Sequence, residues 1–467
     1  MSKKSLLVIL ILSFSLLTST YEYTPAFSIK FIKDPDLKAE LVVKGLRRPT
    51  GLIFTSQNEM LVSQHLGKVQ RIDKNLSEPP QLDAKSAANK TILDLTPIIN
   101  STGERGVLGI DSSQINQVEQ NASDSKVLKV FLIFTRVLNA TDLNNVGCIL
   151  KKCNIGNFVN SIYEYEYRDG KLVNPKLLLD VPIYSNSSIQ HIGGAFTVNP
   201  KDNRIYVTSG DGRGCEFKDC DFDSIYLANS TGTKRVGGIY DIFAGVQSDD
   251  YNATSGQGLD QYAYGIRNSF GLDFDPVTGN LWDTENGPTF GDEINLVKRG
   301  FNSGWPLVQG VWPIEDDKQL SNNPAPDFPK GYFFSENSHH QNSKKVSYGL
   351  ANYSDPEFAW NQSVGVTAMK FFNSDKLGKE YENDLFVGTY QGDIYHFDLN
   401  KERDGFLLKG PLKDKVANNE KELRPIIFSR GLSSGIGITD LEIGPDGYLY
   451  VVAYSTPGGA IFKIVPK

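Results

Sequence analysis

The sequence predicts an all-β protein, and within that class a β-propeller, on two observations. A polar turn followed by a short, apolar, aromatic-rich strand recurs along the chain. Sustained 3.6-residue periodicity is hard to find, whereas Tyr and Phe are abundant, with 21 and 26 residues. The recurring unit occurs in five segments: Asn58–Val62, Asn203–Val207, Gly279–Asp283, Asn383–Val387 and Asp446–Val451.

Three of these units continue through a glycine into a second strand, which predicts β-hairpins. Gly67 leads into Lys68–Asp73, Gly392 into Asp393–Leu399 and Gly459 into Ala460–Pro466. Glycine and asparagine supply the positive φ that tight turns need. Repeated hairpins suit a propeller, whose blades are small antiparallel sheets; an array of β-sandwiches is the alternative. Long loops are expected at 75–89, 112–126 and 314–347.

The N-terminus is typical of a signal peptide over residues 1–26. Lys3 and Lys4 precede an apolar run from Leu6 to Leu17, and small polar residues follow. This run is too short to span a bilayer comfortably; a retained N-terminal anchor is the alternative. Without a linker or charge block in the remainder, residues 36–467 are predicted to form a single domain, secreted or extracytoplasmic.

Cysteines and sequons agree with an oxidising exterior. Cys148 and Cys153 have the same spacing as Cys215 and Cys220, which favours local disulfides, although all three connectivities stay open. Ten Asn-x-Ser/Thr sequons make surface glycosylation an expectation. The net charge of −7 argues against a nucleic-acid or anionic-membrane binder, because there is no basic excess to neutralise phosphates.

One candidate catalytic group is His191, in the segment Gln-His-Ile-Gly-Gly. The following glycines allow another group to approach the backbone closely. A histidine in this position can act as a general base, and a carboxylate such as Asp211, in Ser-Gly-Asp-Gly, can fix its tautomer. A histidine merely hydrogen-bonded in a turn is the alternative.

Two further motifs could hold a ligand. Arg267 and Asn268 follow aromatic residues and could bind a planar anion through charge-assisted hydrogen bonds. Glu285-Asn-Gly287-Pro288 begins a Gly-Pro turn flanked by acids, whose carbonyls and carboxylates suit calcium. A surface arginine and an acidic turn without metal are the respective alternatives.

Taken in order, these motifs resemble the glucose/sorbosone dehydrogenase family, from about Leu46 to the C-terminus. The most specific part is Tyr262 to Pro306, YAYGIRNSFGLDFDPVTGNLWDTENGPTFGDEINLVKRGFNSGWP. The resemblance implies a six-bladed propeller, and the count of six rests on it alone. It further implies an enzyme that uses pyrroloquinoline quinone (PQQ) and calcium to oxidise the C1 hydroxyl of aldoses, passing electrons to an acceptor. Hedgehog-interacting proteins share this fold.

The resemblance also implies residue roles. His191 would take the proton of the sugar hydroxyl, and Asp211 would orient His191. Arg267 and Asn268 would bind the cofactor, with Arg267 also stabilising negative charge that develops in the reaction. The backbone carbonyls of Gly287 and Pro288 would hold the calcium.

Three positions depart from the family pattern. Glu104 stands where the enzymes have a Gln that meets the cofactor, so that a carboxylate faces a tricarboxylate ligand unless Glu104 is protonated or paired with Arg105. Thr439 stands in place of an Arg, and Gln391 in place of a cofactor-contacting Lys. Charged hydrogen bonds are worth about 1.5–3 kcal/mol each, so these changes weaken the expected clamp on the cofactor.

Three functions therefore compete: a quinone-dependent aldose dehydrogenase, a non-catalytic extracellular binding propeller, and a calcium-dependent lactonase-like hydrolase. The family resemblance makes the first the leading hypothesis, and the weakened clamp favours the second as the alternative. The third needs a cage of side-chain carboxylates that the sequence does not display. The fold alone cannot separate them, because function depends on the site.

Overall fold

The computed structural model describes residues 29, 31–73, 82–83, 89–113, 127–138, 158–183, 189–212, 238–243, 260–305, 308–314, 352–431, 436–456 and 458–467. The predicted signal segment 1–26 and all four cysteines lie outside these residues. Among the described helices, none has the length and apolar character needed to cross a membrane.

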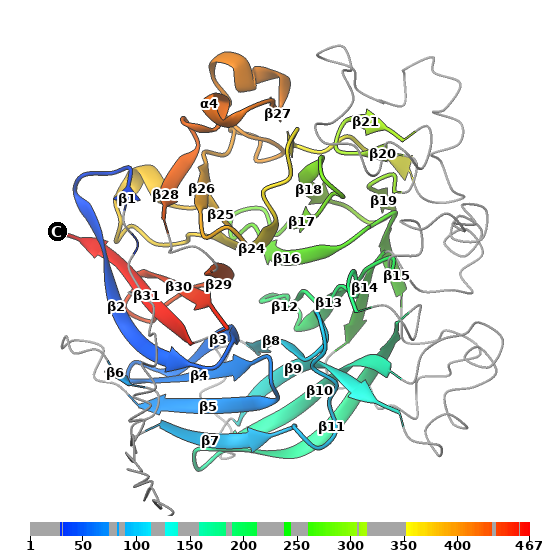
Figure 1. Ribbon diagram of the computed structural model, residues 1–467, viewed down its shortest axis with the longest axis vertical. Helices are drawn as coiled ribbons and strands as arrows, with labels where there is room; N and C mark the ends of the chain where they lie inside the picture. The colour runs from blue at the N-terminus through cyan, green and yellow to red at the C-terminus, as the bar shows by residue number, and fades with distance from the viewer. Residues whose placement is uncertain are drawn as a thin grey trace, which may run out of the picture.

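Antiparallel sheets stand around a common centre, which confirms the predicted all-β propeller class (Figure 1). Within the described residues, six sheets have four to six strands each, and β20 (Val308–Gln309) pairs with β21 (Trp312–Pro313) in a separate hairpin. Each larger sheet is named here after its innermost strand. Short helical turns, η4 (Lys379–Tyr381), η5 (Gly410–Asp414) and α4 (Glu420–Leu423), lie in the connections.

The first three sheets follow chain order. The β3 sheet contains β3 (Pro49–Ser56), β4 (Glu59–Gln64), β5 (Lys68–Asp73) and β7 (Asn89–Asp94). The β8 sheet contains β8 (Val107–Ser112), β9 (Leu128–Val137), β10 (Phe158–Arg168) and β11 (Lys171–Pro182). The β12 sheet contains β12 (Phe196–Val198), β13 (Arg204–Ser209), β14 (Gly238–Phe243) and β15 (Asp260–Tyr264), with β19 (Phe301–Asn302) and β22 (Asn352–Tyr353) at its edge.

The other three sheets take in strands from distant parts of the chain. The β16 sheet contains β16 (Ser269–Phe274), β17 (Leu281–Glu285), β18 (Asp292–Val297), β23 (Phe358–Trp360) and β27 (Val416–Ala417). The β24 sheet contains β24 (Val366–Phe371), β25 (Leu385–Thr389), β26 (Ile394–Phe397), β28 (Ile427–Arg430) and β1 (Phe31–Ile32). The β29 sheet contains β29 (Gly437–Ile443), β30 (Leu449–Tyr454), β31 (Gly459–Pro466), β2 (Leu37–Leu46) and β6 (Leu82–Asp83).

The five predicted turn-and-strand units fall in five different sheets, as the repeat requires. Each unit leads into the second strand of its sheet, namely β4, β13, β17, β25 and β30. The predicted partner strands are β5, β26 and β31. The β8 sheet lacks the unit, and its second strand, β9, was not identified from the sequence.

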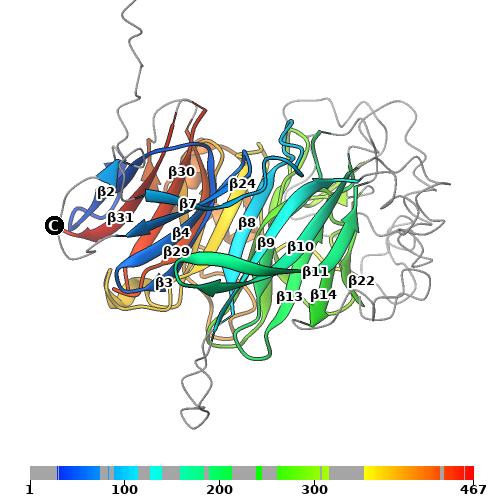
Figure 2. The ribbon, with the colours of Figure 1, turned by 90° about the horizontal axis from the view of Figure 1, so that it is seen from below.

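The innermost strands contact one another in a closed ring. Their order is β3, β8, β12, β16, β24 and β29, and β29 contacts β3 again (Figure 1). In the side view of Figure 2, strands of neighbouring sheets lie side by side across the molecule. At the centre, these six strands and the residues just before them enclose a cavity of about 70 Å³.

Each sheet has a neighbour on either side in the ring, so each of its faces packs against another sheet. Apolar side chains therefore fill the junctions between neighbouring sheets. Trp282, Trp360 and Phe397, for example, pack between the β16 and β24 sheets. Buried aspartates add hydrogen bonds near the centre. Asp111 accepts from the backbone N of Val198 at 2.8 Å, which joins the β8 and β12 sheets.

The ring is closed by strands from the two ends of the domain. In the β29 sheet, β2 pairs antiparallel with β31, with Leu37 opposite Pro466 and Leu46 opposite Gly459. The N-terminal strand thus completes a sheet whose other inner strands come from the C-terminus.

Candidate active site

The predicted site residues gather at one end of the central ring. Glu104, His191 and Asn268 each lie just before an innermost strand, namely β8, β12 and β16. Asp211 and Gly287 follow the second strands β13 and β17. In an antiparallel sheet the start of one strand and the end of the next lie at the same edge, so all these residues reach the same face.

His191 and Asp211 form the predicted pair. The Nδ1 atom of His191 lies 3.0 Å from Oδ1 of Asp211, and both side chains are almost fully buried. The other oxygen of Asp211, Oδ2, accepts from the indole Nε1 of Trp305 at 2.8 Å. The carboxylate is therefore held at both oxygens, and it orients the imidazole so that Nε2 is left to act on a ligand.

The backbone around His191 is strained and tightly enclosed. His191 has φ 53°, a left-handed conformation that non-glycine residues adopt rarely. A Cβ atom on Gly210 would lie 2.3 Å from the carbonyl oxygen of His191, so only glycine fits there. Such strain persists where the surrounding structure imposes it, commonly at functional sites.

Arg267 links the His191 pair to the Gly-Pro turn. Its backbone carbonyl accepts from the N of Asp211 at 2.8 Å. Its Nη1 donates to the carbonyls of Asn286 at 2.7 Å and Gly287 at 3.1 Å, and its guanidinium lies 5.3 Å from the ring centre of Trp305. The carbonyl of Gly287, one of the two predicted calcium ligands, thus accepts from a positively charged side chain.

The carboxylate of Asp292 holds the backbone of the Gly287 turn through hydrogen bonds. Its Oδ1 accepts from the N of Gly287 at 2.9 Å, and its Oδ2 accepts from the N of Val364 and Gly365. At position 287 only glycine fits, because a Cβ would lie 1.8 Å from the carbonyl oxygen of Phe290. The backbone of the turn is therefore held by three hydrogen bonds to one carboxylate and by a close contact that excludes any side chain at position 287.

A buried pair of carboxyl groups supports this region. The hydroxyl of Ser303 lies 2.6 Å from Oε2 of Glu285 and 3.0 Å from Oε2 of Glu293. One hydroxyl hydrogen can serve only one of these oxygens. Burial raises the pKa of both carboxyls; the charge of Asp283 raises that of Glu285 further, and the charge of Glu285 raises that of Glu293. Both effects favour a proton on this pair. Glu285 also accepts from the N of Arg267 at 2.6 Å.

Glu104 lies in the same site. Its Oε2 is enclosed and has no hydrogen-bond partner among the described residues. Burial raises the pKa of Glu104, against the opposing positive charges of His191 and Arg267. The guanidinium of Arg105, the partner considered from the sequence, lies over the ring of Phe158 at 4.1 Å. The charges that act on Glu104 therefore come mainly from within the site.

The remaining predicted residues differ in their surroundings. The Oδ1 of Asn268 accepts from the N of Gly193 at 3.3 Å, so this amide holds the loop of His191. Gln391 is exposed in the β25–β26 turn. Thr439 donates to the carbonyl of Pro49 at 2.9 Å and lines the central cavity. Among the described residues, neither Gln391 nor Thr439 is hydrogen-bonded to the His191 group.

The sequence reasoning missed two residues of the site. Trp305 stood in a quoted motif but received no role, and its bond to Asp211 spans 94 positions. Asp292, one of the acids near the Gly-Pro turn, received no role of its own, and the structure shows that it accepts from the backbone of the turn. A polar side chain next to a Gly-rich motif was the available signal for both.

Comparisons with known proteins concern the chain as a whole. The family model described as Glucose / Sorbosone dehydrogenase matches residues 46–463. The chain belongs to the glucose/sorbosone dehydrogenase family. Similar relatives include an aldose sugar dehydrogenase of Escherichia coli, 32% identical over 213 residues, or 46% of each chain. Quinoprotein glucose dehydrogenase B of Acinetobacter calcoaceticus is 26% identical over 60% of this chain and 54% of its own.

Solved structures of this family share the fold. The soluble aldose sugar dehydrogenase of Escherichia coli in its apo-form has a TM-score of 0.59 and 20% identity, covering 92% of this chain and 100% of that one. The PQQ-bound form of the aldose sugar dehydrogenase from Streptomyces coelicolor has a TM-score of 0.57 and 17% identity, covering 92% and 98%. At these identities the likeness concerns the fold.

Proposed function

We propose that this member of the glucose/sorbosone dehydrogenase family is an exported PQQ- and calcium-dependent dehydrogenase that oxidises the C1 hydroxyl of aldose sugars to lactones. The observation that carries the proposal is the His191–Asp211 pair, which lies beside Arg267 and the carbonyls of the Gly287 turn. Family membership supports the sugar dehydrogenase class. The N-terminal profile and the sequons support export.

Each group of the site has a task in this reaction. His191 accepts the proton of the C1 hydroxyl, and Asp211 stabilises the imidazolium that forms. Arg267 and Asn268 bind and orient the cofactor, and the carbonyls of Gly287 and Pro288 hold calcium. When bound, the quinone supplies the two-electron acceptor for the hydride that leaves C1. The sugar loses one hydride and one proton, which yields the lactone.

We also infer that the propeller has six blades, one for each of the larger sheets. The support is the closed ring of six innermost strands and the placement of five repeat units in second strands. On this inference the β8 sheet is the blade without the repeat signature.

A non-catalytic binding propeller is the second candidate, and Glu104 is the observation that favours it. An enclosed carboxyl group opposes a tricarboxylate cofactor when it is ionised, and Gln391 and Thr439 bring no positive charge.

The deciding experiment combines cofactor binding with turnover. The purified protein is titrated with PQQ in the presence of calcium, and dye reduction is assayed on a panel of aldoses. We expect micromolar binding, weakened by Arg267→Ala and strengthened by Thr439→Arg. His191→Ala should leave binding nearly intact and lower turnover by about 10²–10⁴-fold. If the wild type fails to bind PQQ or to oxidise any aldose, the proposed dehydrogenase function is refuted. The non-catalytic binding propeller would then be the remaining candidate.

A further inference from the structure

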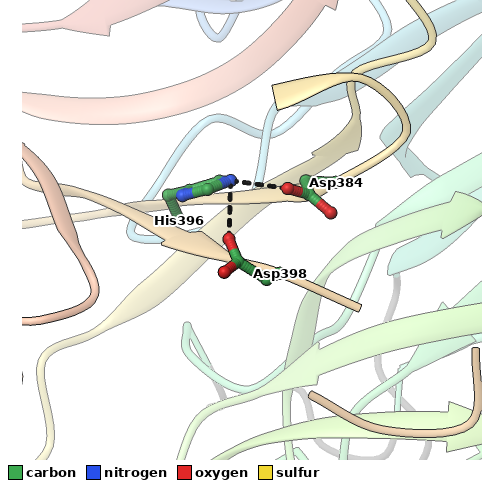
Figure 3. Close-up of side chains that lie close together, drawn as sticks. All are labelled: Asp384, His396 and Asp398. Atoms are coloured by element: carbon green, nitrogen blue, oxygen red, sulfur yellow. Dashed lines mark hydrogen bonds and ion pairs between the residues drawn. The ribbon is translucent and has the colours of Figure 1, made fainter. Parts of the chain in front are cut away.

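A second cluster of potential metal ligands lies in the β24 sheet, apart from the candidate active site. Asp384 immediately precedes β25, His396 is in β26, and Asp398 follows β26. One ligand atom from each lies within 4.8 Å of the other two. Figure 3 shows one imidazole nitrogen between the two carboxylates.

The distances suit a metal ion. The Nε2 of His396 lies 3.0 Å from Oδ2 of Asp384 and 3.6 Å from Oδ1 of Asp398. Around a tetrahedral zinc ion with ligands at about 2.0–2.2 Å, neighbouring ligand atoms lie about 3.3–3.5 Å apart. Small side-chain shifts would therefore place all three atoms in a first coordination shell.

The hydrogen bond between His396 and Asp384 does not account for the position of Asp398 in the cluster. A single N–H on Nε2 can serve Asp384 at 3.0 Å, but the 3.6 Å separation from Asp398 exceeds a hydrogen bond. No other hydrogen bond or ion pair reaches the carboxylate of Asp398 within the described part of the chain. Two carboxylates thus face one nitrogen, and either a protonated imidazole or a bound cation would offset their mutual repulsion.

Two nearby basic side chains are engaged elsewhere. Lys33 donates to the carbonyl of Pro425 at 2.7 Å. Arg403 reaches the carbonyl of Asn383 but is paired with Asp275 through two nitrogen atoms. Lys409 lines the same cavity as Asp398 without an ion pair to it among the described residues.

There is space for further ligands. His396 lines two cavities, one of about 310 Å³ next to Lys33, Asp34 and Tyr381, and one of about 100 Å³ next to Asp398. Water could complete a tetrahedral shell from either side. The imidazole favours a transition metal over calcium or magnesium, which prefer oxygen ligands alone.

We propose that Asp384, His396 and Asp398 form a zinc site that joins the start of β25 to the end of β26. The site is independent of the proposed dehydrogenase chemistry, because none of its residues belongs to the His191 site. Its expected effect is to stabilise the β24 sheet, since binding to the folded state alone raises the free energy of unfolding.

The test uses the full chain freed of metal with a chelator. Isothermal titration with zinc should show one site of micromolar affinity, and cobalt substitution should give the intense visible absorption of four-coordinate Co²⁺. His396→Gln and Asp398→Asn should each weaken zinc binding at least about tenfold and abolish the absorption. Asp375→Asn, which removes an exposed carboxylate outside the cluster, and His191→Gln should leave both unchanged.

Circular dichroism of each variant checks that it remains folded, and calcium serves as the competing ion. Absence of zinc binding to the wild type would overturn the proposal, and the cluster would then be an ion triad of a protonated histidine. Zinc binding that survives in His396→Gln and Asp398→Asn would also overturn it, because the ion would be bound elsewhere on the chain. Neither outcome affects the dehydrogenase proposal, which is tested by quinone binding and turnover.

Discussion

Replacing Asp211 by Asn isolates the contribution of one charge to the proposed reaction. The substitution keeps the shape of the side chain but removes the carboxylate that lies 3.0 Å from His191. In the transition state His191 is gaining a positive charge. At about 4 Å between charge centres and an effective dielectric constant of about 20, the lost attraction is about 4 kcal/mol.

An energy of about 4 kcal/mol corresponds to about a 10³-fold change in rate. Part of it is recovered by the neutral amide, so we expect the turnover number of Asp211→Asn to fall by about 10²–10³-fold. Quinone affinity should change less than about threefold, because Asp211 acts on the imidazole and not on the cofactor. The assay is dye reduction at saturating aldose, alongside a quinone titration.

Asp446→Asn is the matched control, because Asp446 also accepts from a ring side chain, the hydroxyl of Tyr450 at 3.0 Å, but lies outside the site. Its turnover should equal that of the wild type. A turnover for Asp211→Asn within threefold of the wild type would refute the reasoning, since the pair would then have no electrostatic role.

Three further perturbations test the site. Trp305→Phe removes the indole hydrogen bond to the buried carboxylate of Asp211, so urea denaturation should show a loss of about 1–3 kcal/mol; an unchanged midpoint would contradict this. Gly210→Ala should destabilise the fold and abolish activity, whereas Gly405→Ala, whose Cβ would meet only a side-chain atom at 3.5 Å, should be nearly neutral in the same assays. Glu104→Gln should gain stability over the wild type as the pH rises above 4.5. Burial raises the pKa of Glu104, so the unfolded wild type releases this proton at a lower pH than the folded protein, which favours unfolding. Equal pH profiles of the two proteins in thermal denaturation would disprove that effect.

Much of the architecture was predictable because its signals are local. Asn203 and Asn383 have φ 56° and 65°, and Gly279 and Gly447 have φ 76° and 80°, so four of the five units have a residue of positive φ in the turn before the strand. The His191–Asp211 pair was predicted from two glycine-rich motifs and their family resemblance. Contacts between segments that are distant in the chain have no comparable local signal in the sequence. The bond between Trp305 and Asp211 and the pairing of β2 with β31 depend on the assembled ring, and β9 carries no turn signature of its own.

The closure of the ring by β2 and β31 sets how the protein responds to mechanical force. Leu37 lies opposite Pro466, so the outer ends of the two strands are at the same end of the ladder. A force that separates these two ends acts perpendicular to the strands. It breaks the backbone hydrogen bonds of the ladder one after another, whereas a force along the strands would load all of them together in shear. We therefore expect the ring to open from this seam at low force, whereas a pull between Leu46 and Pro466 would load the ladder along its length and meet greater resistance.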